Sequence, residues 1–76
     1  MYESCEFGLA VCVFEPRGEK GLEGYQLGEQ YAYRKMKSVT PGQSPYYRVF
    51  PTFDSDYYET CSTRTFNRFF KKEKNA

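Results

Sequence analysis

The stretch Tyr57–Phe70, with the sequence YYETCSTRTFNRFF, decides the fold because it joins a short aromatic strand to an amphipathic helix. Phe66, Phe69 and Phe70 lie at positions i, i+3 and i+4, which places three rings on one side of a helix predicted over about residues 63–72. Serine and threonine side chains before these rings can cap the first turn. A helix this short is marginal alone, so it has to dock its rings on a sheet.

The remainder of the chain predicts that sheet, because its apolar and aromatic residues alternate with polar ones in short runs. Strands are predicted over residues 5–14, 30–36, 46–50 and 57–61. Short strands with tight connections usually pair as an antiparallel meander. We therefore expect one small domain spanning residues 1–76. Its class is mainly β with one C-terminal helix (α+β), a curled four- to five-stranded antiparallel sheet or SH3-like barrel capped by that helix.

Side-chain alternation predicts which face of each strand is buried. In the first strand the more apolar face is expected to be half buried; its members are Cys5, Phe7, Leu9, Val11 and Val13. The other face is small and weakly apolar, and cover over part of it is left open; its members are Glu6, Gly8, Ala10, Cys12 and Phe14. In the third strand Tyr47 and Val49 should face one way, and Tyr46, Arg48 and Phe50 the other.

Two segments between the predicted strands have the composition of loops. Residues 15–24, EPRGEKGLEG, form a charged glycine-rich loop in which Leu22 is the one residue expected to anchor to the sheet. This loop lacks the Lys-Ser/Thr pair of a phosphate-binding loop. In the segment 38–45, SVTPGQSP, Pro41-Gly42 occupy the central positions that a type II turn prefers.

The residue inventory argues against an enzyme. The chain has no histidine and three cysteines, Cys5, Cys12 and Cys61. Free, mostly buried thiols are expected, with a Cys5–Cys61 or a Cys12–Cys61 bridge as the alternative. A four-ligand zinc site would need a carboxylate or a second chain. We predict no catalytic residues, no metal and no cofactor.

Charge and hydropathy set the expected compartment. The net charge is +1, with six acidic and two basic residues in positions 1–30 and four acidic and nine basic residues in positions 31–76. The two halves can neutralise each other within one fold. No apolar run approaches the roughly 20 residues of a membrane span, and the acidic N-terminus is unlike a secretory signal. A soluble, intracellular protein without membrane contact is expected; its oligomeric state stays open.

Three segments carry a resemblance to a group of proteins: LGEQYAYRKM (27–36), PYYRVFP (45–51) and DYYETCSTRTFNRFF (56–70). Together they resemble the small accessory proteins of tailed phages and prophages, over roughly residues 24–72. That resemblance implies a counter-defence protein, similar to anti-CRISPR proteins, which blocks the surface of a host bacterial protein or ribonucleoprotein complex. It also implies that the protein acts in the host bacterial cytoplasm. It carries over no catalytic residue.

Adjacent tyrosines supply the first candidate site. In the pairs Tyr46-Tyr47 and Tyr57-Tyr58, neighbours on a strand point to opposite faces, so one of each pair should point outward. Tyrosine and arginine are enriched at binding hot spots. The predicted protein-binding patch is Tyr46, Arg48, Phe50 and Tyr57; the other possibility is that the helix or the 15–24 loop covers this face.

The alternative function is a small nucleic-acid-binding β-barrel. Single-strand binders interleave aromatic rings that stack on bases with basic residues that follow phosphates. Tyr33, Arg34, Lys35 and Lys37 supply both residue types on one strand, with Tyr46 and Arg48 across a hairpin. The nearly neutral chain speaks against this function, because such binders usually form a clearly basic domain.

Overall fold

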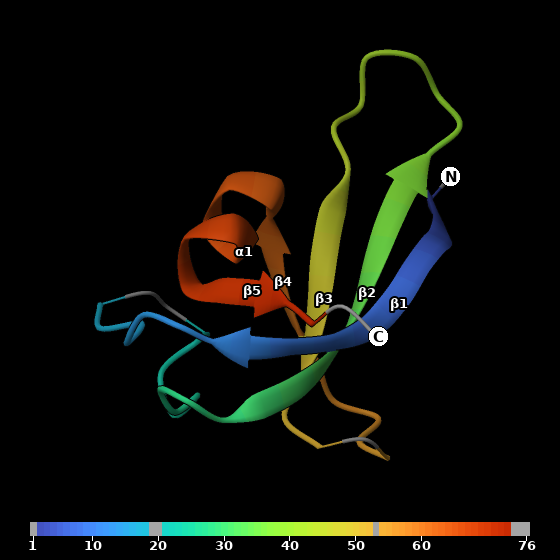
Figure 1. Cartoon of the computed structure of the whole chain (residues 1–76). Coiled ribbons are helices and arrows are strands. Elements are labelled where there is room, and N and C mark those ends of the chain that lie inside the picture. Colours follow the sequence, from blue (N-terminus) through green and yellow to red (C-terminus); the bar gives the residue numbers. More distant parts are fainter. Residues whose placement is uncertain (1, 19–20, 53, 74–76) are drawn as a thin grey trace.

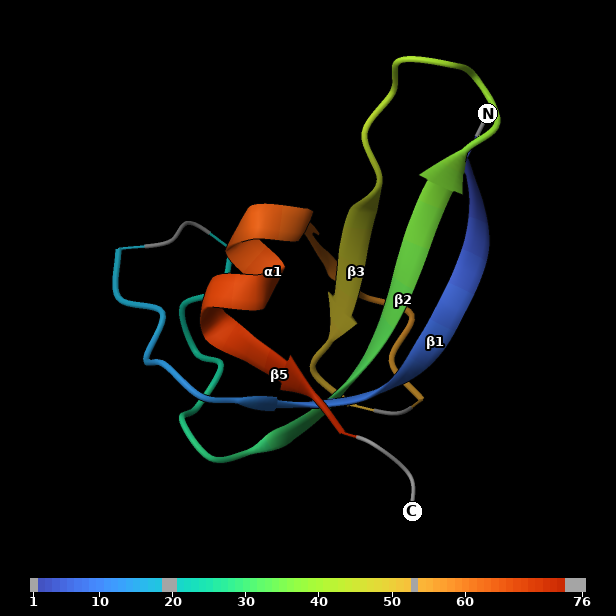
Figure 2. The same cartoon turned by 45° about the horizontal axis from the view of Figure 1, so that its top comes forward.

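The structure is a computed structural model that describes residues 2–18, 21–52 and 54–73. In chain order its elements are β1 (Tyr2–Cys12), β2 (Gln30–Ser38), β3 (Tyr46–Phe50), β4 (Glu59–Ser62), α1 (Thr63–Phe69) and β5 (Phe70–Lys72) (Figure 1). The strands form one five-stranded sheet in the order β4-β3-β2-β1-β5, and every neighbouring pair is antiparallel. The sheet curls into a half-barrel, and α1 lies in its hollow beside β5 (Figure 2).

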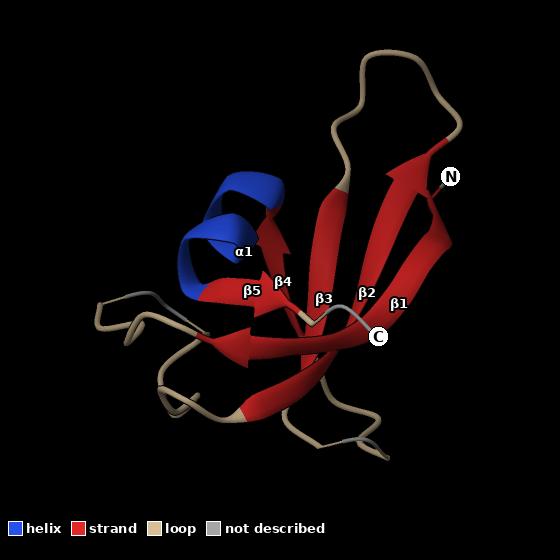
Figure 3. Cartoon of the chain, in the orientation of Figure 1, coloured by secondary structure: helices blue, strands red, loops and turns tan. Residues whose placement is uncertain are grey.

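The predicted fold class is confirmed: the protein is mainly β, with a single short helix near the C-terminus among the described residues (Figure 3). β3 has the predicted bounds, whereas β1 begins and ends earlier than residues 5–14. The turn at Pro41-Gly42 forms as predicted. Gly42 has a φ of 87°, and the Gln43 amide donates to the Thr40 carbonyl at 3.4 Å.

α1 is shorter than the predicted helix over residues 63–72. Ser62 caps its start, since the Ser62 side chain accepts a hydrogen bond from the Thr65 amide at 3.1 Å. Phe70 ends it in an extended conformation, with φ −130° and ψ 148°. The chain then pairs with β1 as β5, the fifth strand, with Phe70 opposite Cys12. Pairing gives the backbone of this segment hydrogen-bond partners on β1 and still buries the Phe70 ring.

The core lies between α1 and the concave, inner face of the sheet. Phe66 stacks on Tyr47 with ring centroids 3.9 Å apart and an interplanar angle of 4°, and it also contacts Phe70 at 5.4 Å. Leu22 from the predicted loop is buried in the same cluster, as expected. Tyr25 closes the end of the core, where its hydroxyl donates to the Val49 carbonyl at 3.1 Å.

The prediction for the buried face of β1 is wrong. Ala10 and Cys12 are buried, whereas Phe7, on the predicted core face, is 76% exposed. The physical reason is the size of the rings opposite: a Cβ atom on Gly8 would lie 3.3 Å from Cε1 of Tyr33. The inner face of β1 has to be small so that the rings can approach its backbone.

Candidate functional site

The outer face of the sheet, opposite α1, carries the predicted protein-binding residues of β3. Tyr47 and Val49 are buried on the inner face, and Tyr46, Arg48 and Phe50 alternate with them as half-buried outer residues. That division is the one predicted from the sequence. No helix or strand of the described residues covers this outer face, as Figures 1 and 2 show.

Arg48 lies at the centre of an aromatic cluster. Its guanidinium carbon is 4.5 Å from the ring centroid of Tyr58 and 5.9 Å from that of Tyr46, which are cation–π distances. One terminal nitrogen donates to the Tyr46 hydroxyl at 3.2 Å. The Phe50 ring lies 5.5 Å from the Tyr58 ring, and Tyr2 packs edge-on against Tyr46 at 4.8 Å. We call Tyr46, Arg48, Phe50 and Tyr58 the arginine cluster.

Tyr57 is the one predicted member that the structure leaves out of this cluster. It is 61% exposed, and its hydroxyl donates to the carboxylate of Glu59. The neighbouring residue Tyr58 occupies the position in the cluster that was predicted for Tyr57. The signal that one of the two tyrosines joins the outer face was present in the sequence, but the choice depends on how the loop before β4 enters the sheet.

The outer face continues onto β2 and β1. Arg34 is exposed, and its guanidinium lies 5.7 Å from the centroid of the Phe7 ring. Beside them is an open groove of about 440 Å³, lined by Phe7, Leu9, Ala32, Arg34 and Phe50 among others. Phe7 and this groove escaped prediction because the apolar face of β1 was expected to be buried.

The predicted nucleic-acid-binding residues do not assemble on one surface. Tyr33 is only 6% exposed and packs in the core, so its ring cannot stack on a base. Lys35 points to the inner face, where its ammonium lies 5.9 Å from the Tyr47 ring centroid. Lys37 and Arg34 are both exposed, but the alternation of β2 sends them to opposite faces. Because of this alternation, the basic residues of β2 do not form the continuous positive surface that the nucleic-acid-binding interpretation predicts.

A second polar cluster lies at the edge of the inner face. The carboxylate of Glu6 accepts hydrogen bonds from Lys72 at 2.8 Å and from the Tyr33 hydroxyl at 2.6 Å, and these two bonds lower the pKa of Glu6. Burial, followed by the bond to Glu6, raises the pKa of Tyr33 to about 12.

Burial disfavours the charged form of Lys72, but its hydrogen bonds to Glu6 and Tyr47 outweigh that effect and raise its pKa. A lysine held protonated in this way is a poor base or nucleophile at neutral pH. The Glu6–Lys72 ion pair therefore has a structural role, because it links β1 to β5.

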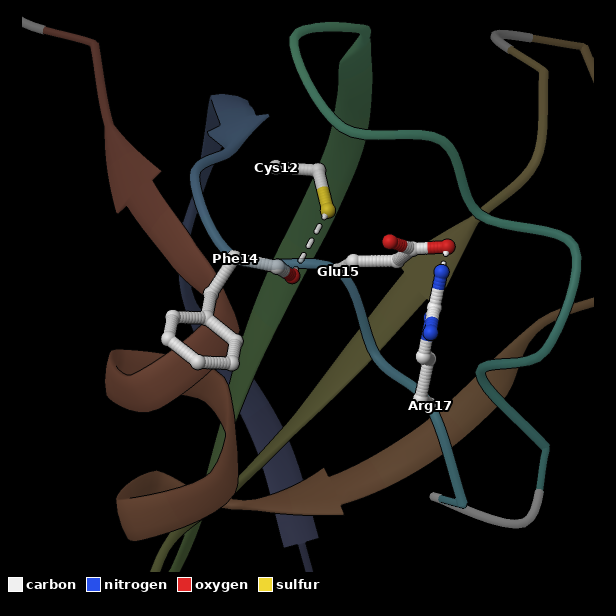
Figure 4. A network of polar contacts seen from close by, with 4 residues as sticks. All are labelled: Cys12, Phe14, Glu15 and Arg17. Carbon is white, nitrogen blue, oxygen red and sulfur yellow. Dashed lines mark hydrogen bonds and ion pairs between the residues drawn. The ribbon is translucent and has the colours of Figure 1, made fainter.

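Two of the cysteines lie on β1, where Cys5 is exposed and Cys12 is buried, and half-buried Cys61 lies on β4. The Cys12 thiol donates to the Phe14 carbonyl at 3.4 Å, next to an ion pair between Glu15 and Arg17 at 3.2 Å (Figure 4). Burial raises the pKa of the Cys12 thiol, which disfavours the reactive thiolate. Cys5, Cys12 and Cys61 are all described, and no disulfide joins them. Among the described residues, no three acidic or cysteine side chains gather in a group that could hold a metal ion.

Comparison with protein-family models, with curated proteins and with solved structures found no match. Within residues 2–18, 21–52 and 54–73, no helix has the length and apolar character needed to cross a membrane. Proposals about function therefore depend on the side chains of the outer face and on the resemblance described above.

Proposed function

We propose that this chain is a phage-type protein-binding inhibitor of a bacterial defence complex such as CRISPR-Cas. It acts without catalysis, by placing the outer face of its sheet on a functional surface of the target. The observation that carries the proposal is the arginine cluster, in which Arg48 is held beside the rings of Tyr46 and Tyr58. No helix or strand in the described part of the chain covers this face. Arginine and tyrosine dominate binding hot spots because they combine contact area with hydrogen-bonding groups.

The outer face has the size and rigidity that such binding needs. The molecule measures 35 × 32 × 23 Å, so one broad face can supply the roughly 800 Å² that each partner contributes to a standard interface. Most of the cluster lies on β3, between two hydrogen-bonded strands. Side chains held on a paired strand lose little freedom on binding, which favours affinity.

The alternative function, a nucleic-acid-binding β-barrel, finds less support in these side chains. Stacking on bases requires exposed rings beside cations, and Tyr33 is in the core. Within the described residues, the exposed rings of Phe7 and Phe14 each lie beside one arginine, Arg34 and Arg68 respectively. A test of the inhibitor function should nevertheless distinguish the two.

The experiment uses the tagged full chain to capture protein from lysates of bacteria that express a defence complex, followed by a nuclease assay with the captured complex. Arg48→Ala and Tyr58→Ala should each lower recovery and inhibition by about tenfold or more, because truncated hot-spot residues typically cost that much affinity. Tyr57→Ala is the matched control, an adjacent tyrosine outside the cluster, and should behave like the wild type.

Two results would count against the proposal. One is equal recovery with Tyr57→Ala and Tyr58→Ala. The other is retention of DNA or RNA alone, lost steeply as the salt concentration rises, which would indicate the nucleic-acid-binding function instead.

A further inference from the structure

Two arginines occupy directly opposite positions on neighbouring strands of the outer face. Arg34 on β2 and Arg48 on β3 are direct partners in the antiparallel register, so their side chains leave the sheet on the same side. Like charges in directly opposite positions destabilise a sheet. Among the described residues the ion pairs are Arg17–Glu15 and Lys72–Glu6, so neither outer arginine has a carboxylate within 4.0 Å.

Both guanidinium groups are held by uncharged neighbours. Arg34 turns toward β1, where it contacts the Phe7 ring and donates to the Ser4 hydroxyl at 3.4 Å. Arg48 turns the other way, toward Tyr58. Its Nε is shut off from solvent and has no hydrogen-bond partner. Two positive charges therefore remain without a negative partner on the proposed binding face.

We infer that Arg34 and Arg48 together bind an aspartate or glutamate carboxylate of the partner protein. An apolar side chain next to that carboxylate fills the groove lined by Phe7, Leu9 and Phe50. The inference rests on the proposed function and specifies the chemistry of the partner segment. Guanidinium forks match carboxylates in geometry, and charge-assisted hydrogen bonds are about twice as strong as neutral ones.

The surroundings of the arginines favour a protein carboxylate over the phosphates of a nucleic acid. On the outer face of β2, Arg34 is flanked by Ala32 and Met36. On β3, Arg48 is flanked by Tyr46 and Phe50. Each strand thus contributes one cation between uncharged side chains, which suits one acidic side chain within an apolar contact. A nucleic-acid backbone would need a longer run of cations.

The test uses the full chain, isotopically labelled, and two acetylated and amidated tripeptides, Leu-Asp-Leu and Leu-Asn-Leu, at equal ionic strength. The arginine side-chain NMR signals report binding. The aspartate peptide should bind about tenfold or more tightly than the asparagine peptide and should shift the Nε–H signals of Arg34 and Arg48. Arg34→Gln and Arg48→Gln should each remove most of that preference.

Lys37→Gln is the control, since it removes an exposed cation of the same strand on the other face and should keep the preference. Arg34 is exposed, so Arg34→Gln tests the site even if Arg48→Gln does not fold. Equal binding of the two peptides, or an equal loss in Lys37→Gln, would overturn the inference. Tighter binding of an oligothymidine than of the aspartate peptide would overturn it in favour of a phosphate site.

Failure of the inference and failure of the proposed function are distinguishable. Capture of a defence complex that Tyr58→Ala abolishes but Arg34→Gln leaves unchanged would retain the inhibitor function and overturn the carboxylate site. Peptide discrimination by Arg34 and Arg48 without capture of any complex would support the carboxylate site and count against the inhibitor function.

Discussion

The two faces of the curled sheet use the same residue types in opposite ways. On the inner face, aromatic rings pack against one another, as in the parallel stack of Tyr47 and Phe66. On the outer face, the rings of Tyr58 and Phe7 lie beside the guanidinium groups of Arg48 and Arg34. The inner face is covered by α1 and most of its rings are buried (Figure 2). The outer face is open and carries two arginines that form no ion pair within the described residues.

This difference shows how a 76-residue chain can hold a core and a binding surface within one thin sheet. Alternation along β3 sends Tyr47 and Val49 inward and Tyr46 and Arg48 outward. Ring-to-ring contacts inside contribute mainly to the free energy of unfolding. Ring-to-arginine contacts outside stay partly solvated, so they should contribute more to binding than to stability.

The largest expected difference between the two faces appears when one aromatic ring is removed from each face and the stabilities of the two variants are compared. Phe66→Ala removes a ring with 0% exposure that contacts Tyr47, Tyr33 and Phe70. It should lower the free energy of unfolding by about 3–5 kcal/mol, which is enough to unfold much of the population of a small domain. Urea denaturation followed by circular dichroism measures this loss.

Phe7→Ala is the matched control for Phe66→Ala, because the same ring is removed from a position that is 76% exposed. Its free energy of unfolding should stay within about 0.5 kcal/mol of the wild type. Similar losses in the two variants would contradict the division of the sheet into a structural and a binding face.

The second test adds atoms to the inner face instead of removing them. Gly8→Val would place its Cβ 3.3 Å from Cε1 of Tyr33, and its two methyl groups would need further room on the same face. Overpacking of this kind typically costs about 1–3 kcal/mol of unfolding free energy. Phe7→Val introduces the same side chain one residue earlier, on the outer face, and should be nearly neutral. An equal urea midpoint for both valine variants would show that Tyr33 moves aside freely.

The Gly8 and Phe7 variants test the feature that the sequence predicted least well, which is the buried face of β1. The strand at β3, the Ser62 cap and the burial of Phe66 follow from alternation, capping chemistry and helical spacing, all of which are local. The buried face of β1 does not follow from them. Its inner residues, Gly8 and Ala10, are less apolar than its outer ones. Gly8 is half-buried and Ala10 is buried, because large rings from elsewhere in the chain pack against this face.

The candidate site could likewise be predicted only where it depends on the residues of a single strand. Tyr46, Arg48 and Phe50 come together because they lie on one strand face. The presence of Tyr58 in place of Tyr57 depends on the loop between β3 and β4. The opposition of Arg34 and Arg48 depends on the register of β2 against β3. Register is a property of paired strands, so single-strand periodicity could not reveal it.

The smallest expected effect is on the free energy of unfolding contributed by the hydrogen bonds of Glu6 at the edge of the inner face, and this contribution depends on pH. Hydrogen bonds from Lys72 and Tyr33 lower the pKa of Glu6 below its ordinary value of 4.5. A carboxyl whose pKa is lowered by folding stabilises the protein above its ordinary pKa. That contribution is lost as the pH falls through the lower, folded value. Because Glu6 is 39% exposed, the contribution should be less than about 1 kcal/mol.

Glu6→Gln should therefore reduce the free energy of unfolding near neutral pH and bring the variant closer to the wild type in acid. Urea midpoints of both proteins at about pH 7 and about pH 3 measure the change. Glu3→Gln removes an exposed carboxylate from the same strand, one that accepts no side-chain hydrogen bond within the described part of the chain, and should leave the difference between the two pH values unaltered. A gap between wild type and Glu6→Gln that is the same at both pH values would mean that the ionised carboxylate does not hold β5 against β1. The short fifth strand would then depend on Phe70 and its backbone pairing alone.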